Sequence, residues 1–341
     1  MKKIGVLGAG TWGMALARML SKSGHSVTVW SAIEKEIDEF SRDRQHPNLP
    51  GMEIPREIAF TKNIEEVCKG MDILLFAVPS VFVRGTAKKA APYVCAGQVI
   101  VDVAKGIEAD TLFTMTQIIA DEVKNPEVKL VALSGPTHAE EVAKDMPTTI
   151  VSASHDAAAA ELVQEVFSNA CMRVYTNEDV EGVELCGALK NVIALAAGVA
   201  TGYGCGDNAK AALITRGMAE IARLGVAMGC REQTFGGLAG IGDLIVTATS
   251  QHSRNNRCGM LLGQGVPADE ATAQVGMVVE GIHALPAAMR LKEKYGVEMP
   301  IVETVDAVVK GEITAAEAVK NLMSRGQKTE LPPAALDNDY R

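Results

Sequence analysis

A single lysine interrupts a nearly uncharged helical stretch, residues 184–198, and its amine is well suited to proton transfer. Burial of Lys190 among Leu189, Val192 and Ile193 would lower the pKa of the amine, because desolvation disfavours the charged form. A lysine tuned in this way exchanges a proton at physiological pH. The alternative is a solvated helix face from which the amine reaches water. A glycine loop and a cationic cluster elsewhere in the chain favour the proton-transfer role.

A glycine-rich turn follows a short apolar strand, residues 4–7, and precedes a helical pattern. Gly8, Gly10 and Gly13 have the spacing Gly-x-Gly-x-x-Gly. The first glycine permits a tight turn, the second lets the backbone approach a pyrophosphate, and the third lets the helix pack on the strand. A second strand at residues 27–30 completes the mononucleotide-binding half. The motif therefore predicts a dinucleotide site, with a purely structural glycine turn as the alternative.

The residues after that second strand normally indicate whether NAD or NADP binds. An acidic residue there bonds the ribose 2′-hydroxyl, and an arginine suits a 2′-phosphate. Residues 31–35 are Ser-Ala-Ile-Glu-Lys, so neither signal stands in its usual place and the preference stays undecided. A proline-rich stretch at residues 47–55 predicts an exposed loop that can fold over the cofactor.

Three further apolar strands, at residues 72–78, 99–103 and 129–133, each end in a polar turn. In an open parallel sheet, ligands bind beyond the carboxyl ends of the strands. Lys105 is thereby placed at the mouth of a cleft, where its charge suits an anionic substrate; an ordinary surface lysine is the alternative. The turn at residues 134–141 directs backbone N–H groups and a hydroxyl into the same cleft.

Polar residues also interrupt the apolar helices of the second half of the chain. Asp207 is interpreted as the N-cap of a long helix, with a place in the active site as the alternative. Asp243 and residues 247–255 suggest an anion pocket, because a guanidinium fork, an amide and a hydroxyl suit phosphate oxygens. Glu280 begins another helix, as a capping carboxylate or a cofactor contact. His138, which has no identifiable partner, is interpreted as a satisfied polar residue rather than a catalyst.

Composition narrows the class of protein. The 341 residues, 48% of them hydrophobic and 22% charged, are enough for two cores. A net charge of -9 argues against nucleic-acid and anionic-membrane binding, which need a basic surface. Seven scattered cysteines indicate reduced thiols in the cytoplasm, and scattered histidines predict no metal site. The N-terminal apolar run is too short for a signal peptide, and residues 185–204 are predicted to form a buried core helix rather than a membrane span.

These patterns predict an α/β fold, a Rossmann-like dinucleotide-binding domain followed by an all-α C-terminal domain. Strands at residues 148–153 and 172–175, with a helix at 156–168 between them, extend the first domain before the periodicity becomes helical. The predicted division is a dinucleotide-binding domain at 1–180, an α-helical substrate and catalytic domain at 181–326, and a loosely ordered tail at 327–341. The helices predicted in the second domain span residues 184–199, 208–228, 256–262 and 279–295.

Short motifs stand in a fixed order along the chain, at residues 8–13, 105–108, 134–142, 184–191, 207–217, 240–244, 254–255 and 279–281. Together they resemble NAD(P)-dependent glycerol-3-phosphate dehydrogenase, and such a spaced set is more specific than any one motif. The resemblance implies reversible reduction of dihydroxyacetone phosphate to sn-glycerol 3-phosphate with NAD or NADP. It also implies a cytoplasmic enzyme that supplies glycerolipid synthesis, binds a small phosphorylated substrate and forms a homodimer.

The resemblance further implies roles for individual residues. Lys190 matches the family's proton-exchanging lysine, and Asp243 would orient it or the substrate hydroxyl. The implied substrate-binding positions are Lys105, Gly135, Thr137, Lys190, Asp243, Ser253, Arg254 and Asn255. The implied cofactor positions, with the glycines of the first turn, are Gly8, Gly10, Thr11, Trp12, Gly13, Lys105, Ala139, Arg254, Val278 and Glu280. NADPH-dependent relatives commonly carry arginine near residues 31–33, where this chain has none.

The expected mechanism contains two opposing effects. Burial lowers the pKa of Lys190, a nearby Asp243 raises it, and the sequence leaves the balance open. Arg254 and Asn255 would hold the phosphate and so position the carbonyl. Two alternatives stay open: a two-domain hydroxy-acid dehydrogenase, which would bind a carboxylate instead of a terminal phosphate, and a non-enzymatic dinucleotide-sensing module.

Overall fold

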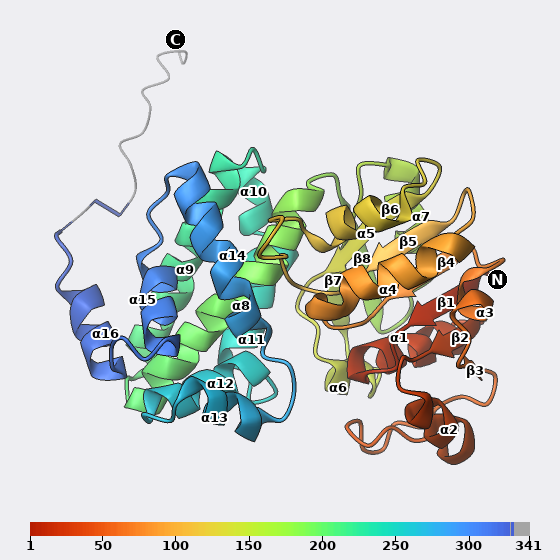
Figure 1. The fold of residues 1–341 in the computed structure, drawn as a ribbon, viewed down its shortest axis with the longest axis horizontal. Coiled ribbons are helices and arrows are strands. Elements are labelled where there is room, and N and C mark those ends of the chain that lie inside the picture. Colours follow the sequence, from red (N-terminus) through yellow and green to blue (C-terminus); the bar gives the residue numbers. More distant parts are fainter. Residues whose placement is uncertain (328, 331–341) are drawn as a thin grey trace, which may run out of the picture.

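The computed structural model describes residues 1–327 and 329–330. Two lobes lie side by side: helices flank a sheet in the N-terminal lobe, and the C-terminal lobe is helical (Figure 1). This architecture confirms the predicted α/β fold class with an all-α C-terminal part. Most of the predicted tail, residues 328 and 331–341, lies outside the described residues.

The N-terminal lobe is built on one eight-stranded sheet. Its strands are β1 (Lys3–Leu7), β2 (Ser26–Trp30), β3 (Ala59–Thr61), β4 (Ile73–Phe76), β5 (Val99–Asp102), β6 (Lys129–Ser134), β7 (Thr148–Ala153) and β8 (Met172–Asn177). The order is β3-β2-β1-β4-β5-β6-β7-β8, and all neighbours are parallel except β6 and β7. The chain leaves β1 on one side and returns as β4 on the other. A topological switch point therefore lies between β1 and β4, where open α/β sheets bind ligands.

Alternating strand residues bury two separate cores, one on each face of the sheet. The helices of this lobe are α1 (Thr11–Lys22), α2 (Glu34–Asp43), α3 (Ile64–Cys68), α4 (Val83–Ala90), α5 (Met115–Val123), α6 (Ala139–Val142) and α7 (Ala157–Phe167). In β4, Ile73 and Leu75 pack with α1 and α7, whereas Leu74 and Phe76 pack with α4 and α5. Strands buried on both faces are continuous apolar runs, which is why they were recognisable in the sequence. The three residues of β3 were too few to be predicted.

Helix α8 (Val180–Tyr203) forms the axis of the C-terminal lobe. Around it lie α9 (Asp207–Ala227), α10 (Glu232–Phe235), α11 (Asp243–Thr249), α12 (Arg254–Gly263), α13 (Ala268–Val275), α14 (Glu280–Tyr295), α15 (Pro300–Val309) and α16 (Ala315–Met323). Helix α8 is long and apolar enough to cross a membrane, but its most apolar window is wholly buried within the fold. The predicted core helix is therefore confirmed.

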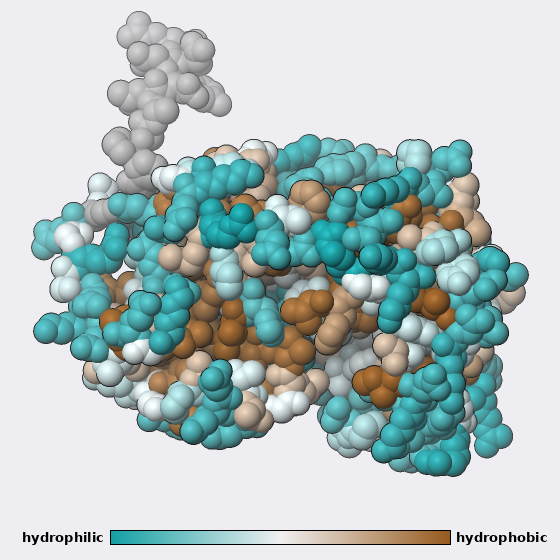
Figure 2. Space-filling view, in the orientation of Figure 1, coloured by the Kyte–Doolittle hydropathy of each residue, from teal (hydrophilic) through white to brown (hydrophobic). Residues whose placement is uncertain are grey.

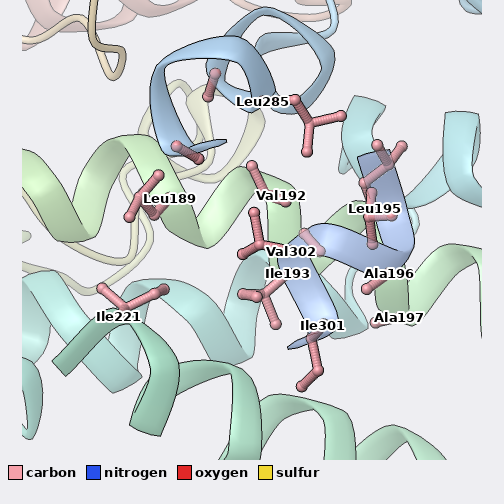
Figure 3. Packing of buried hydrophobic residues seen from close by; sticks show 14 of the residues in the cluster. Leu189, Val192, Ile193, Leu195, Ala196, Ala197, Ile221, Leu285, Ile301 and Val302 are labelled. Atoms are coloured by element: carbon pink, nitrogen blue, oxygen red, sulfur yellow. The ribbon is translucent and has the colours of Figure 1, made fainter. Parts of the chain in front are cut away.

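Apolar side chains leave α8 in several directions, which explains why it is hydrophobic all round. Ile193 and Leu189 lie on the axis helix, with Ile221 on α9, Leu285 on α14 and Ile301 on α15 in the surrounding cluster (Figure 3). Hydrophilic residues cover most of the outer surface, and apolar ones are visible mainly over the inner part of this lobe (Figure 2). The burial of α8 supplies the low-polarity setting of Lys190.

Helices α8 and α12 approach each other so closely that only glycine fits at their crossing. A Cβ at Gly198 would lie 2.2 Å from the carbonyl oxygen of Asn256, and one at Gly259 would lie 2.2 Å from that of Leu195. The next pair, Gly202 and Gly263, repeats the pattern one turn later. Small residues at this spacing let two helix backbones pack together. The packing brings the N-terminus of α12 alongside α8 near Lys190.

The N-cap prediction for Asp207 is wrong. The cap of α9 is Gly206, and Asp207 is the first helical residue, with a fully exposed side chain 3.5 Å from Lys210. Its negative charge still lies near the positive end of the helix dipole, so an aspartate in the first turn stabilises α9 without acting as the cap. In the C-terminal lobe, helices α10, α11, α13, α15 and α16 were also not predicted.

Candidate active site at the junction of the two lobes

The glycine loop between β1 and α1 has the shape that a dinucleotide needs. Gly8 has φ +120°, and a Cβ there would lie 2.6 Å from the carbonyl oxygen of Ala77. A Cβ at Gly13 would lie 2.2 Å from the carbonyl oxygen of Gly8, so the helix packs directly on the turn. Gly10 caps α1 without a side-chain hydrogen bond and faces open space. The loop therefore leaves room and backbone donors for an anion at the helix N-terminus.

The other cofactor positions of the N-terminal lobe lie next to this loop or across the cleft from it. Thr11 and Trp12 begin α1, and Trp12 packs against the core of the sheet. Ala139 is the buried first residue of α6. The helix α6 packs against α1, so its position is consistent with a contact to a ligand at the glycine loop.

The loop at residues 47–55 is anchored in the core rather than wholly exposed. Leu49, Met52 and Ile54 are buried under α1 and α2. His46 precedes this loop, stacks on Phe40 with ring centroids 5.1 Å apart, and is hydrogen-bonded to the backbone of Ala9. The loop thus supports the glycine turn from one side. Sequence analysis missed His46, because a lone histidine carries no local signal.

Lys190 is buried, with only 4% of its surface exposed, so the solvated alternative is wrong. Its Nζ donates to Oγ1 of Thr247 at 2.6 Å and lies 3.0 Å from Oδ1 of Asp243. The Thr247 hydroxyl in turn donates to the carbonyl oxygen of Asp243 at 2.7 Å. Both partners are on α11, so the two helices α8 and α11 fix the direction of the amine.

Asp243 links the two lobes through a second ammonium group. Its Oδ2 accepts from Nζ of Lys105, which follows β5, at 2.7 Å. The Lys105 amine also donates to the carbonyl oxygen of Gly135 at 3.0 Å and to Oγ1 of Thr137 at 3.4 Å. One buried carboxylate therefore bridges two lysines, and each lysine comes from a different lobe.

The pKa of Lys190 is lowered to about 8, and burial of the amine is the largest cause. The Asp243 carboxylate opposes this shift and raises the pKa, while the charges of Lys105 and Arg254 lower it further. Desolvation therefore outweighs the ion pair, which answers the question that the sequence left open. A pKa near 8 leaves both protonation states populated around neutral pH.

Gly135 and Ser253 each have a local structural role: Gly135 permits a tight backbone conformation, and Ser253 caps a helix. Gly135 has φ +152°, and a Cβ there would lie 3.0 Å from Cα of Ile150. The hydroxyl of Ser253 accepts from the backbone N–H of Asn256 and caps α12. These contacts explain why glycine and serine occupy the two positions irrespective of a bound substrate.

Arg254 begins α12, and in the described part of the chain its guanidinium has no ion pair or side-chain hydrogen bond. Its influence on the pKa of Lys190 places it near the amine. A free guanidinium at a helix N-terminus, in an otherwise acidic protein, suits a phosphate group.

Asn255 connects three helices at the same place. Its Nδ2 donates to Oδ1 of Asn191 on α8 at 3.0 Å, and its Oδ1 accepts from the backbone N–H of Gly281 on α14 at 2.8 Å. Asn255 therefore has a structural role, and its role in substrate binding stays a prediction. Asn191, the last residue of the motif at 184–191, was not predicted to have a role, and its only signal was its place next to Lys190.

Glu280 binds across the lobe junction instead of capping its own helix. Its carboxylate accepts from the backbone N–H of Ser80 at 3.1 Å and from the Ser80 hydroxyl. Ser80 follows β4 at the switch point, so this contact brings the start of α14, and with it the segment that contains Val278, to that edge of the sheet. The role of Ser80 was not predicted, because its partner lies 200 residues away along the chain.

A second carboxylate of α8 also crosses the junction. Glu184 is buried and accepts from the hydroxyl of Thr114 at 2.7 Å, and from the backbone N–H and hydroxyl of Thr116 at 2.8 and 2.5 Å. Burial raises the pKa of Glu184 in spite of these bonds. Glu184 thereby caps the N-terminus of α5 and fixes α8 against the sheet lobe. An acidic residue inside an apolar helix was the available signal.

His138 is less completely satisfied than predicted. Its Nε2 is buried and has no hydrogen-bond partner among the described residues. The ring lies 5.8 Å from that of His252, and burial lowers the pKa of the imidazole. In this part of the chain no carboxylate is hydrogen-bonded to the ring, so the arrangement does not form an acid–base dyad.

The two matching family models and two similar curated relatives are glycerol-3-phosphate dehydrogenases. The chain matches the family models for the N-terminus of NAD-dependent glycerol-3-phosphate dehydrogenase over residues 3–160 and for its C-terminus over residues 179–320. It is 66% identical over 335 residues to glycerol-3-phosphate dehydrogenase [NAD(P)+] 2 of Lactobacillus delbrueckii subsp. bulgaricus, covering 97% of this chain and 99% of that protein. It is 53% identical to the Agathobacter rectalis enzyme, covering 97% and 98%. The crystal structure of glycerol-3-phosphate dehydrogenase from Coxiella burnetii superposes with TM-score 0.91 at 34% identity, covering 95% of this chain and 99% of that one.

Proposed function

The chain belongs to the NAD-dependent glycerol-3-phosphate dehydrogenase family, and from this premise we propose that Lys190 is the acid–base residue of its reaction. The protein is an oxidoreductase that interconverts dihydroxyacetone phosphate and sn-glycerol 3-phosphate with NAD(H) or NADP(H). Family membership excludes the two alternative functions, a hydroxy-acid dehydrogenase and a non-enzymatic dinucleotide sensor. The observation that carries the proposal for Lys190 is its burial in the bridged site with a pKa of about 8.

Carbonyl reduction needs a proton at the oxygen on which negative charge develops. The bound nicotinamide supplies the hydride. Protonated Lys190 donates the proton from Nζ, and neutral Lys190 accepts it from the substrate hydroxyl in the reverse direction. Asp243 and Thr247 occupy one side of the amine and so direct it, because Nζ has three donor positions and uses two here. Asp243 is thus a positioning partner of Lys190, alongside any contact it makes with the substrate.

The phosphate of the substrate binds at the start of α12 in this proposal. Arg254 offers two parallel donors, and the helix N-terminus adds a favourable dipole. Lys105 adds a second positive charge at the cleft mouth. Gly135, Thr137, Ser253 and Asn255 shape the pocket through the turns and hydrogen bonds described above. Binding energy from the phosphate end positions the carbonyl beside Lys190.

The cofactor lies along the glycine loop in this proposal. Gly8, Gly10 and Gly13 supply the turn and the space for the pyrophosphate. The positions that would contact the remainder of the dinucleotide are Thr11, Trp12, Lys105, Ala139, Arg254, Val278 and Glu280.

Substitution of Lys190 tests the acid–base role. Lys190→Ala should lower turnover by about a hundredfold to ten-thousandfold, the usual range for a lost acid–base group. NADH binding, measured separately by fluorescence titration, should stay near the wild-type value because the glycine loop is untouched. Near-normal turnover would remove Lys190 from the mechanism. Lys320→Ala, on the remote helix α16, is a matched control.

The cellular setting is proposed from the same resemblance. We infer a cytoplasmic homodimer that supplies glycerol 3-phosphate for glycerolipid synthesis, with functional domains at residues 1–180 and 181–326. Sedimentation of the purified protein at several concentrations tests the dimer, and a monomeric species throughout would contradict it.

A further inference from the structure

The carboxylate of Glu36, on helix α2, lies at the end of β2, although Glu36 does not follow this strand directly in the sequence. β2 runs beside β1, and the backbone N–H of Gly8 donates to the carbonyl oxygen of Trp30 at 2.9 Å. The next residue, Ser31, is 6% exposed, and its hydroxyl donates to Oε2 of Glu36 at 2.7 Å. The same hydroxyl accepts from the backbone N–H of Ile33 at 3.1 Å. The first turn of α2 therefore folds back and returns Glu36 to the strand end.

The side chain of His46 lies near both Glu36 and the glycine loop. The imidazole of His46 is hydrogen-bonded to the backbone of Ala9, and it also interacts electrostatically with the Glu36 carboxylate. Nδ1 of His46 accepts from the backbone N–H of Asn48 at 3.1 Å, which fixes the ring. Burial lowers the pKa of His46, so the ring adds no positive charge at neutral pH. Glu36 thus lies beside the loop that would hold the dinucleotide.

The cations around this carboxylate are already engaged. Lys35 lies 3.5 Å from Glu39, and Arg42 lies 2.7 Å from Asp43. Lys62 is shared between Glu34, at 3.6 Å, and Asp38, at 2.8 Å. Arg44 donates to the carbonyl oxygens of Pro55 and Ile58 and lies over the ring of Phe60. In the described part of the chain, the exposed Arg56 of the neighbouring loop is the one nearby cation without an ion pair or side-chain hydrogen bond.

This arrangement discriminates between the two dinucleotides. A ribose 2′-hydroxyl can donate to a carboxylate at the end of β2, whereas a 2′-phosphate would meet the negative charge of Glu36. Among the described residues nearby, only the exposed Arg56 of the neighbouring loop is an unpaired cation that could offset this repulsion. We propose that the Ser31–Glu36 pair makes this enzyme select NAD(H) over NADP(H). The inference rests on the proposed function only in assuming that the dinucleotide binds along the glycine loop.

Direct binding tests the selection without turnover. We expect the dissociation constant of NADH, measured by nucleotide fluorescence, to be at least about tenfold lower than that of NADPH, because NADPH loses the hydrogen bond to Glu36 and its phosphate meets the carboxylate charge. Competition by ADP-ribose and by 2′-phospho-ADP-ribose should show the same order. Wild-type binding of NADPH as tight as that of NADH would overturn the selection, and Arg56→Ala would then show whether Arg56 binds the phosphate.

Substitutions assign the effect to the carboxylate. Glu36→Gln keeps the shape and the hydrogen bond from Ser31, and it should reduce the NADH preference by about tenfold, through weaker NADH binding and tighter NADPH binding. Glu39→Gln, on the same helix but paired with Lys35, should leave the ratio unchanged. An unchanged ratio in Glu36→Gln, in a protein with unaltered thermal unfolding, would contradict the inference. Failure of both dinucleotides to bind the wild type would instead overturn the proposed function, and this inference with it.

Discussion

Oδ1 of Asp243 lies 3.0 Å from Nζ of Lys190, at a place where both side chains are almost completely buried. The pair joins α11 to α8, and the other carboxylate oxygen holds Lys105 from the sheet lobe. A buried ion pair is weak evidence for stability, because desolvation costs about as much as the attraction returns. Its value here is geometric and electrostatic: it directs an amine whose pKa of about 8 suits proton exchange.

The two directions of the reaction should depend on pH in opposite senses. Reduction requires protonated Lys190, so its turnover should be high below the pKa of about 8 and fall above it. Oxidation of glycerol 3-phosphate requires the neutral amine, so its turnover should rise through the same region. Initial rates at saturating substrate, measured in both directions across this range, provide the check. Profiles that move in the same direction would contradict the assignment.

Asp243→Asn should shift the reduction profile to lower pH. The carboxylate raises the pKa of Lys190, and its loss leaves desolvation unopposed. The change also removes the charged partner of Lys105, and turnover near neutral pH should fall by about tenfold or more, because less of the amine is protonated. Asp207→Asn, which alters a fully exposed side chain, should change neither quantity. A profile unchanged in Asp243→Asn would show that this carboxylate does not tune Lys190.

Arg254→Ala should selectively weaken the binding of phosphorylated substrate. Loss of a charge-assisted bidentate contact costs about 1.5–3 kcal/mol or more of binding free energy. The KM for dihydroxyacetone phosphate should therefore rise by at least about tenfold. The reaction with unphosphorylated dihydroxyacetone should change little. Arg257→Ala, on the exposed side of the same helix, is the matched control. An equal loss with both substrates would argue against a phosphate site at Arg254.

Glu184→Gln should loosen the lobe junction. A neutral amide cannot reproduce the three hydrogen bonds that the carboxylate accepts from Thr114 and Thr116, and unfolding free energy should fall by about 1–3 kcal/mol. Thr116→Val removes one of the three bonds and should have a smaller effect. Chemical denaturation gives both values. A Glu184→Gln protein as stable as the wild type would show that the junction does not depend on this carboxylate.

Gly259→Ala should destabilise the helical lobe. The added Cβ would meet the carbonyl oxygen of Leu195 at 2.2 Å, so the backbones of α8 and α12 must separate, at a cost of about 1–3 kcal/mol. Gly85→Ala, in the middle of α4 with no atom near the new Cβ, should be neutral or stabilising by up to about 1 kcal/mol. Thermal unfolding of the two variants compares them directly. Equal melting temperatures would contradict close packing at this crossing.

Local patterns were sufficient for much of the fold and part of the site. The apolar strands, the glycine turn and the lysine helix each depend on residues within one short segment, where burial and turn preferences act locally. Local patterns failed where the segment was short, as in β3, or where a cap was assigned from residue type alone, as at Asp207. They also missed partners far along the chain, such as Ser80 for Glu280.

By itself, the sequence determined every strand except β3, the core helix α8, the dinucleotide loop and the family, because these follow from periodicity and from motifs of fixed spacing. Only the tertiary structure decided that desolvation outweighs the Asp243 charge at Lys190, and that Glu36 returns to the end of β2. Both outcomes depend on how segments that are separate in the sequence pack against one another, and local periodicity does not predict that packing. Coulomb and solvation energies depend on distances in space, which cannot be read from the separation of two residues in the sequence.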